Sequence, residues 1–202
     1  SKKESSLLGF NKKESEYKQK ILEARSKLNY MENLEKESDG YIRSVKSIID
    51  LSRRNDRYKT HVYGTLAGII STEEKYEKAI EIAMGGYTQN IVVDKDNIAK
   101  ELIAFLKDGM LGRATFLPLE SIRVYKEDIP SQVKNCAGYI GSAVELVSYD
   151  KLYEAAVRLA LGRTIIVDTI ENGIKISKVT KNSAKIVTLS GDVIAQTGSI
   201  TG

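Results

Sequence analysis

The stretch STEEKYEKAIEIAMG, at residues 71–85, occurs a second time in the chain, as SYDKLYEAAVRLALG at residues 148–162. The two stretches align without gaps at an offset of 77 residues, and six of the 15 positions are identical. Both carry apolar residues at the spacing of one helix face, followed by a glycine where a helix would end. A repeat of this kind predicts two related structural units.

Each copy predicts a helix with a serine at its start and a glycine at its end. Ser71 and Ser148 are good N-cap residues, and Ser71 with Glu74 has the spacing of a capping box. Gly85 and Gly162 stand where a left-handed C-terminal cap is expected. The local sequence therefore predicts helices that begin at the serines.

The flanks of the two helices repeat as well. A short apolar segment precedes each helix, and a β-branched segment ending in aspartate follows it, so both are predicted to be strands. The predicted strands are 66–70, 91–94 and 114–117 in the first copy, and 143–147, 165–168 and 185–189 in the second. Asp94 and Asp168 end corresponding strands, which favours structural caps or turns over a carboxylate pair that binds a metal.

We therefore expect an α+β fold with two pseudo-symmetric subdomains of small mixed sheets and helices. The subdomains are predicted at 61–119 and 140–202, with a polar connector at 120–139. Small sheets leave edges that must be paired or covered. The halves could pair with each other, or with a second molecule by strand addition.

Residues 1–60 have a different composition, with no proline and a surplus of basic residues: 15 Lys and Arg against 10 Asp and Glu. A narrow apolar seam at alternating four- and three-residue spacing predicts a coiled-coil arm at 1–37, although a helix packed on the domain would show the same pattern. A wider apolar face at 41–51 predicts a second helix within 38–60. The seam is Tyr17, Ile21, Ala24, Leu28 and Met31.

A basic cluster ends this region and is the candidate site for an anionic partner. It consists of Arg53, Arg54, Arg57 and Lys59, with Tyr58 among them. Lysine and arginine side chains in such a cluster can bind nucleic-acid phosphates, while the alternative is a solvated helix face.

Several function classes find no support in the composition. The chain has one cysteine and one histidine, which excludes an internal disulfide and paired-histidine metal motifs. It has no phosphate-binding loop of the G-x-x-x-x-G-K-[ST] type. Its longest apolar runs are far shorter than the ~18 residues of a membrane span.

Four segments in order resemble the hinge domain of bacterial SMC (structural maintenance of chromosomes) proteins. GRATFLPL at 112–119 is the most specific of them, and AIEIAMG at 79–85 is followed by QNIVV at 89–93. Near the end, IVTLSGDVI at 186–194 precedes GSITG at 198–202, and DGYIRSVKSII at 39–49 is similar to the element that joins the arm to the hinge. The resemblance covers roughly residues 38–202.

The resemblance implies a dimerisation hinge of a prokaryotic SMC protein, which joins two coiled-coil rods into a homodimer by pairing each subdomain with the opposite one of its partner. It implies weak, non-specific contact with DNA, kleisin-type partner subunits and a cytoplasmic location on the nucleoid, with no membrane contact. The fragment itself would not be an enzyme and would hold no cofactor, because ATP and Mg²⁺ belong to the ATPase heads of the parent protein. A DNA-binding module in which dimerisation is secondary is the alternative.

The resemblance also implies interface residues at the C-terminal end. Gly198 and Gly202 would allow close backbone approach between the two copies, together with Thr197 and Ser199. Thr197 stands where the family usually has a glycine, so the backbone or the tightness of the contact should differ there.

Overall fold

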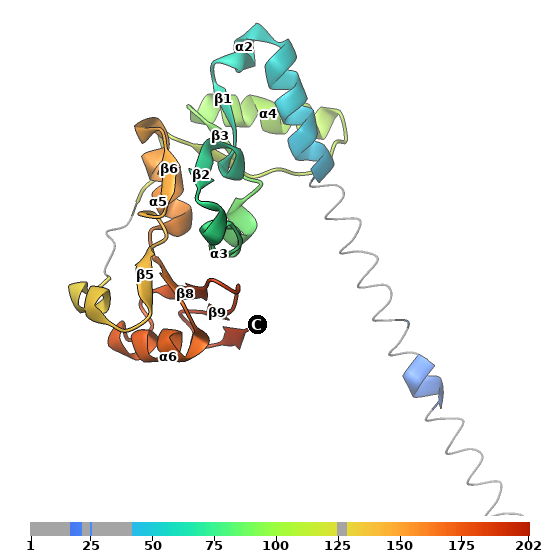
Figure 1. Ribbon diagram of the computed structural model, residues 1–202. Coiled ribbons are helices and arrows are strands. Elements are labelled where there is room, and N and C mark those ends of the chain that lie inside the picture. Colours follow the sequence, from blue (N-terminus) through green and yellow to red (C-terminus); the bar gives the residue numbers. More distant parts are fainter. Residues whose placement is uncertain (1–16, 22–24, 26–41, 125–128) are drawn as a thin grey trace, which may run out of the picture. The chain divides into compact units, whose positions relative to one another are not determined.

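The computed structural model describes residues 17–21, 25, 42–124 and 129–202 (Figure 1). The chain divides into two compact units, Ser1–Arg43 and Ser44–Gly202. The described residues of the first unit are helical, but most of the coiled-coil arm predicted at 1–37 lies outside the described residues. All described strands belong to the second unit, which contains both copies of the sequence repeat.

The first half of this unit opens with the helical residues 44–54, which confirm the second predicted helix. Its remaining elements are short helices and short strands in alternation. They are α2 (Asp56–Lys59), β1 (Val62–Thr65), the 3₁₀ helix η1 (Leu66–Ile69), β2 (Ile70–Thr72), η2 (Glu74–Tyr76), α3 (Glu77–Met84), η3 (Gly85–Tyr87), β3 (Ile91–Val93), α4 (Asp96–Asp108) and β4 (Phe116–Pro118).

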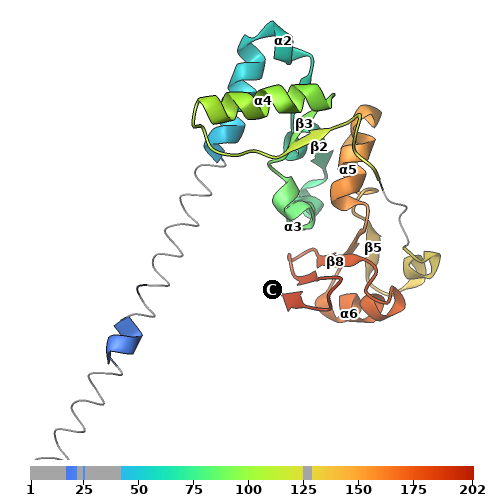
Figure 2. The same ribbon diagram turned by 180° about the vertical axis from the view of Figure 1, so that it is seen from behind.

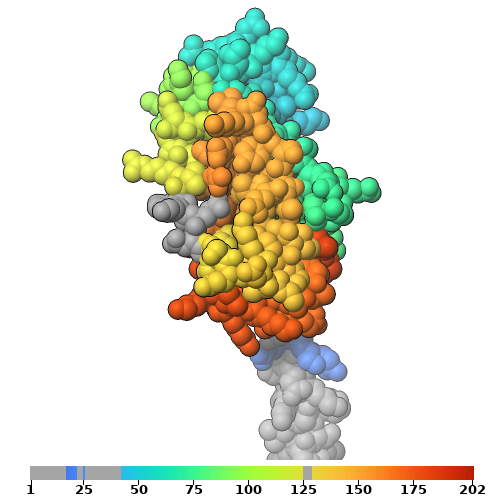
Figure 3. Space-filling model, turned by 60° about the vertical axis from the view of Figure 1, so that its left-hand side comes forward, coloured from blue at the N-terminus to red at the C-terminus, as the bar shows by residue number. Residues whose placement is uncertain are grey.

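From β1 onward, the second half repeats the order of the strands and α-helices and adds a hairpin at its end. Its elements are η4 (Ser131–Asn135), β5 (Tyr139–Ser142), β6 (Val147–Tyr149), η5 (Lys151–Tyr153), α5 (Glu154–Leu161), β7 (Thr164–Val167), α6 (Ile170–Val179), β8 (Lys185–Thr188), β9 (Val193–Ile194) and β10 (Ile200–Thr201). The end of the connector, with η4, lies on one face of the unit next to the residues that come after it (Figure 3).

The two halves have the same sheet topology. In the first half, β1 pairs antiparallel with β3, and β3 pairs parallel with β4. In the second half, β5 pairs antiparallel with β7, and β7 pairs parallel with β8. Even the irregularity in the first strand recurs, before Gly64 in one half and before Gly141 in the other. The predicted α+β class and the pseudo-symmetry are confirmed, while the predicted domain boundaries stay a prediction.

A two-stranded antiparallel sheet of β2 and β6 joins the halves on their pseudo-twofold axis. Strands β2 and β6 lie side by side in Figure 1, and Figure 2 shows β2 from behind. Ser71 lies opposite Ser148, its own counterpart in the repeat, and the neighbouring pairs are related by exchange of the halves. The predicted role of these serines as helix N-caps, and the capping box of Ser71 with Glu74, were therefore wrong. Strand pairing between the halves uses the backbone of both serines, and the α-helices begin only at Glu77 and Glu154.

Two further local predictions were wrong for related reasons. Residues 66–69 form the 3₁₀ helix η1 and 143–146 form a turn, so the strands lie on either side of these segments. Gly85 ends α3 with a positive φ of 52° but a ψ of −125°, which is not the left-handed helical conformation, and Gly162 has a φ of −60°. Gly162 thus ends α5 in an ordinary right-handed conformation that needs no glycine.

One hydrophobic core runs through both halves. Val92 of β3 and Ile166 of β7 are fully buried in the same cluster, as are residues of α3 and α5 on either side of the pseudo-twofold axis. A second, smaller cluster lies between α6, η4 and the five-stranded sheet. Because the larger core is shared, the halves are expected to unfold together rather than as separate domains.

Candidate functional site

The free edges of the two larger sheets are the first candidate site. The three-stranded sheet has the order β1-β3-β4, and the five-stranded sheet has the order β10-β9-β8-β7-β5. The outer edge of β8 is covered by β9, and β9 by β10. In the described part of the chain, no strand covers the corresponding edge of β4. The last strand of each half is therefore an edge strand, β4 in the first half and β10 in the second, while β1 and β5 form the opposite edges of the two sheets.

Backbone pairing shows which groups these edges present. In β10, Ala195 donates to the Ser199 carbonyl at 2.9 Å, so in the alternating antiparallel pattern Ile200 directs its N–H and C=O away from β9. In β4, the Thr115 carbonyl and the Leu119 N–H face β3. Phe116 therefore turns its N–H and C=O outward, and Pro118 offers only a carbonyl. Both edges carry unpaired groups that a further strand can bind.

The four predicted interface residues surround β10. Gly198 has a φ of 85° in the turn between β9 and β10, and the Thr197 and Ser199 hydroxyls lie 3.1 Å apart in the same turn. Gly202 follows β10, and a Cβ there would lie 2.8 Å from Asp192 Oδ1. All four residues are exposed. The turn is held in place because Gln196 Nε2 donates to the Ser183 carbonyl at 2.8 Å.

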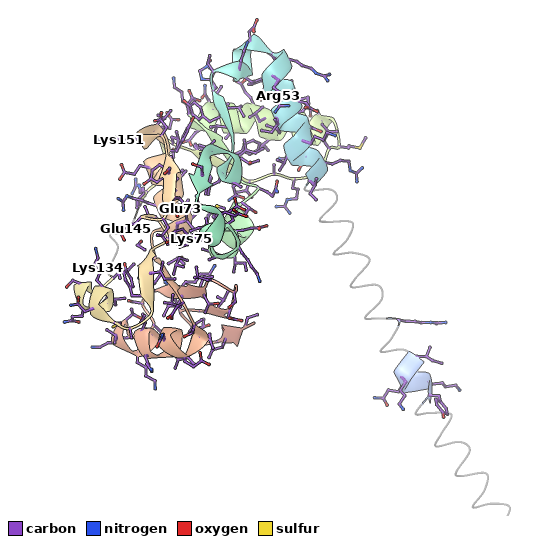
Figure 4. The ribbon with its side chains drawn as sticks, in the orientation of Figure 1. Arg53, Glu73, Lys75, Lys134, Glu145 and Lys151 are labelled. Carbon is purple, nitrogen blue, oxygen red and sulfur yellow. The ribbon has the colours of Figure 1, made fainter. Side chains whose placement is uncertain are left out.

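The basic cluster is the second candidate site, and its members differ in their surroundings. Arg53 extends from the helical residues 44–54 (Figure 4) and lines an open recess of about 450 Å³ with Lys59. Ser52, Tyr63, Thr65 and two glycines contribute to the same recess. Arg54 is exposed nearby in the sequence. Two cations on one recess can together hold a phosphate group.

Arg57, in contrast, is held by a carboxylate. Its Nε and Nη2 donate to Glu101 of α4 at 2.9 and 2.6 Å, and the Tyr58 hydroxyl donates to the same carboxylate at 3.3 Å. The hydrogen bond from Arg57 lowers the pKa of Glu101, and the hydrogen bond to Glu101 raises the pKa of Arg57. Because Glu101 neutralises much of its charge locally, Arg57 is a weaker candidate for DNA contact than Arg53 or Lys59. Sequence reasoning missed this pair, since 44 residues separate its members.

The two strand-end aspartates have structural partners. Asp168 Oδ1 accepts hydrogen bonds from the Thr169 backbone at 2.6 Å and from Asn172 Nδ2 at 2.9 Å, at the start of α6. Asp94 Oδ2 lies 2.6 Å from His61 Nδ1. Across residues 42–124 and 129–202 and the few described residues before them, no group of three or more His, Cys, Asp or Glu side chains could hold a metal ion. No helix within those residues is long and apolar enough to cross a membrane.

Comparison with known proteins assigns this architecture. The family model described as "SMC proteins Flexible Hinge Domain" matches residues 59–177. The chain belongs to the SMC hinge family. The Chromosome partition protein Smc of Desulfitobacterium hafniense is 38% identical over 172 residues, and that of Bacillus subtilis is 34% identical over 187 residues. These matches cover 85% and 91% of the chain but only 14% and 15% of the two relatives, so the chain spans about a seventh of their length.

Solved SMC hinges share the fold. A crystal structure of an asymmetric dimer of the Geobacillus stearothermophilus SMC hinge domain has a TM-score of 0.73 at 32% identity and covers 88% of this chain and 72% of its own. The Pyrococcus furiosus SMC hinge domain has a TM-score of 0.60 at 32% identity, covering 79% and 87%. The family assigned from four sequence segments is confirmed, and the matched part is the hinge rather than an ATPase head.

Proposed function

We propose that this SMC hinge joins two copies of its chain into a homodimer through the open edges β4 and β10. The observation that carries the proposal is that the last strand of each half, β4 and β10, pairs on one side only and leaves its outer edge open. A two-fold dimer that pairs β4 of each copy with β10 of the other satisfies both edges at once. The crystal structure of an asymmetric dimer of the related G. stearothermophilus hinge domain supports dimerisation itself, and the choice of edges rests on the strand order of this chain.

A proline at position 200 tests this edge pairing without disturbing the chain's own ladder. Ile200 points its N–H outward, so Ile200→Pro removes a donor of the free edge but no hydrogen bond to β9. Sedimentation equilibrium of the full chain should show a dimer for the wild type and for Ile200→Thr, and a monomer for Ile200→Pro. A dimer of unchanged affinity in Ile200→Pro would contradict the proposal.

The choice of position 200 follows from the structure around the interface glycines. Substituting Gly202 would bring a side chain against Asp192 within the same molecule, and Gly198 has a positive φ that other residues rarely adopt. A double glutamate variant at these glycines could therefore lose dimerisation by distorting its own hairpin. Ile200 is an exposed residue in ordinary strand conformation and avoids this ambiguity.

The second proposed function is weak, sequence-independent binding of DNA at the junction of arm and hinge. Arg53 and Lys59 on their shared recess, with exposed Arg54, support it. Non-specific binding of this kind has a Kd of about 10⁻⁴–10⁻⁶ M at physiological salt and weakens steeply as salt rises. A dimer would present two such clusters, which adds avidity.

A charge-matched pair of variants separates this site from general electrostatics. Changing Arg53, Arg54 and Lys59 to glutamate should abolish binding in a fluorescence anisotropy titration and flatten its salt dependence. The control variant changes three exposed lysines of α6 and its C-terminal turn to glutamate, which alters the net charge by the same amount. It should keep most of the affinity for DNA. These residues are Lys175, Lys178 and Lys181. Equal losses in both variants would show that the junction is not a distinct site.

In the full-length protein, the hinge would hold together two coiled-coil rods whose heads bind ATP and Mg²⁺, so the hinge itself would need no cofactor. Kleisin-type subunits would bind elsewhere on such a protein, and the assembly would act on the chromosome in the cytoplasm. Co-purification of DNA and of kleisin-type subunits with the full-length protein, but only of DNA with the hinge, would test this division of roles.

A further inference from the structure

Lys185, the first residue of β8, crosses from the second half of the molecule to the first. Its Nζ donates to the Ile82 and Ala83 carbonyls at 3.0 and 2.9 Å. Both carbonyls belong to the last turn of α3, where helical carbonyls have no partner within the helix and the helix dipole is negative. The lysine therefore satisfies groups of the first half with a charge from the second.

Burying the ammonium group of Lys185 costs free energy, and a lysine that served only solubility would stay exposed. Lys185 is half-buried, and burial lowers the pKa of its ammonium group. Within residues 42–124 and 129–202, no carboxylate lies within ion-pairing distance of it. Its desolvation is thus compensated by the two carbonyls of α3, which makes the geometry of that contact restrictive.

The contact exists on one side of the pseudo-twofold axis. In the register of the parallel strands, Lys185 precedes Ile186, the partner of Ile165, and the corresponding residue before Phe116 is Thr115. Threonine carries no amine and has a much shorter side chain. The repeat counterparts of the two carbonyls belong to Leu159 and Ala160 of α5. Thr115 has no ammonium group that could donate to them, so the contact is not repeated there.

The turn after β8 rests on the same helix. Gly191 has a φ of 101°, and a Cβ there would lie 2.6 Å from Ile82 Cδ1 and 3.0 Å from Lys78 Cε. Strand β8 thus meets α3 at its first residue and again just beyond its last. The hairpin of β9 and β10 begins directly after this second contact.

We propose that Lys185 is a positioning residue: it fixes β8 and its hairpin on α3, and so sets the open edge β10 relative to the open edge β4. This role rests on the proposed dimer. A two-fold dimer needs both edges of one molecule to meet both edges of the other simultaneously, so the orientation of the halves within one copy decides the fit. One ammonium group on two terminal carbonyls resists sliding of β8 along α3 better than apolar contact does, because hydrogen bonds are directional.

The test compares three variants of the full chain. Lys185→Met removes the ammonium but keeps an unbranched side chain, Lys185→Arg restores a cationic donor, and Lys175→Met removes an exposed lysine of α6 as a matched control. The dimer Kd is measured by sedimentation equilibrium well below the melting temperature, with circular dichroism to verify folding. Lys185→Met should weaken dimerisation by about tenfold or more, as expected for the loss of hydrogen bonds from a charged donor. Lys175→Met should match the wild type, and Lys185→Arg should recover most of the affinity.

A second readout does not depend on dimerisation. Spin labels at position 100 on α4 and position 178 on α6, in a Cys136→Ser background and diluted with unlabelled chain, report the distance between the halves by electron–electron double resonance. The distribution of distances between the two spin labels should broaden or shift in Lys185→Met. In Lys185→Arg it should again resemble that of the wild type. A folded Lys185→Met with wild-type Kd and an unchanged distribution would overturn the positioning role. A wild-type chain that stays monomeric would instead overturn the proposed dimer, and the distance measurement would still decide whether Lys185 orients the halves.

Discussion

The two halves of this SMC hinge share their strand order, their bulge and their central helix, yet they differ at the residues around strand ends and edges. The first half ends at the open edge of β4, whereas the second continues into the hairpin β9–β10. His61 faces Asp94 in the first half, while its repeat counterpart in the second half is Gly138, and Asp168 binds Asn172 instead. The two halves are thus alike in the strands and helices that form the common core, and they differ at the residues around the strand ends and edges.

The ends of α4 and α6 show a likeness that the sequence repeat does not. Met110 and Lys181 follow these helices with φ values of 48° and 51°. In both, the next residue donates to a carbonyl five residues back, Leu111 to Leu106 at 2.9 Å and Asn182 to Ser177 at 2.9 Å. This is the Schellman arrangement, in which glycine is the usual residue at that position. In both halves, a residue other than glycine therefore adopts the left-handed conformation, which costs backbone free energy.

The largest expected effect tests whether the shared core makes the halves one folding unit. Ile166→Ala leaves a cavity in the shared core beside β7 and should lower the free energy of unfolding by about 2–5 kcal/mol. Val92→Ala, at the counterpart position, removes two side-chain carbon atoms instead of three and should cost less. Urea unfolding monitored by tyrosine fluorescence and circular dichroism should give one coincident transition in both variants. Two separate transitions would show that the halves are independent domains.

The second comparison concerns the counterparts His61 and Gly138. A Cβ at Gly138 would lie 2.2 Å from Asp168 Oδ1 and 2.5 Å from Asn172 Nδ2, and the residue has a φ of 81°. Gly138→Ala should therefore destabilise the chain by about 1–3 kcal/mol through overpacking and backbone strain. His61→Ala loses a partly exposed side-chain contact with Asp94 and should cost no more than about 1 kcal/mol. Equal costs, measured by thermal unfolding, would contradict this difference between the halves.

The third prediction concerns acid stability at the start of α6. The hydrogen bond from Asn172 holds the pKa of Asp168 below its ordinary value of 3.8. A carboxylate whose pKa is lower in the folded state stabilises the fold above its unfolded pKa, and this stabilisation is lost as the pH falls through the folded value. Asn172→Ala should therefore lower the urea midpoint at pH 7 but have less effect near pH 2. An equal shift at both pH values would show that Asn172 acts through packing alone.

The smallest expected effect is a gain in stability at the two helix ends. Met110→Gly and Lys181→Gly relieve a left-handed residue without removing a buried contact, because both side chains are exposed. Each should raise the free energy of unfolding, by a few tenths of a kcal/mol up to about 1 kcal/mol. A loss of stability in one variant only would show that its side chain makes a contact that its counterpart lacks.

The family, the fold class and the two related halves could be predicted from the sequence because they depend on local patterns. Apolar spacing identifies the face of α3 and of α5, and β-branched runs identify β3 and β7. The segment at 112–119 was specific enough to indicate the hinge family. These features repeat within short windows, so no knowledge of distant contacts was needed.

How those segments pack against one another could not be predicted from the sequence. Ser71 looked like an N-cap because nothing near it in sequence shows that Ser148, 77 residues away, pairs with it on the axis between the halves. Arg57 looked like a free cation until Glu101 was placed beside it, and Lys185 looked like an ordinary strand residue until α3 offered its last carbonyls. In each case the fold brings to the group a partner that lies far away in the sequence. Hydrogen bonds and ion pairs act over a few ångströms. The partner that a side chain binds is therefore determined by distance in space and not by separation along the chain.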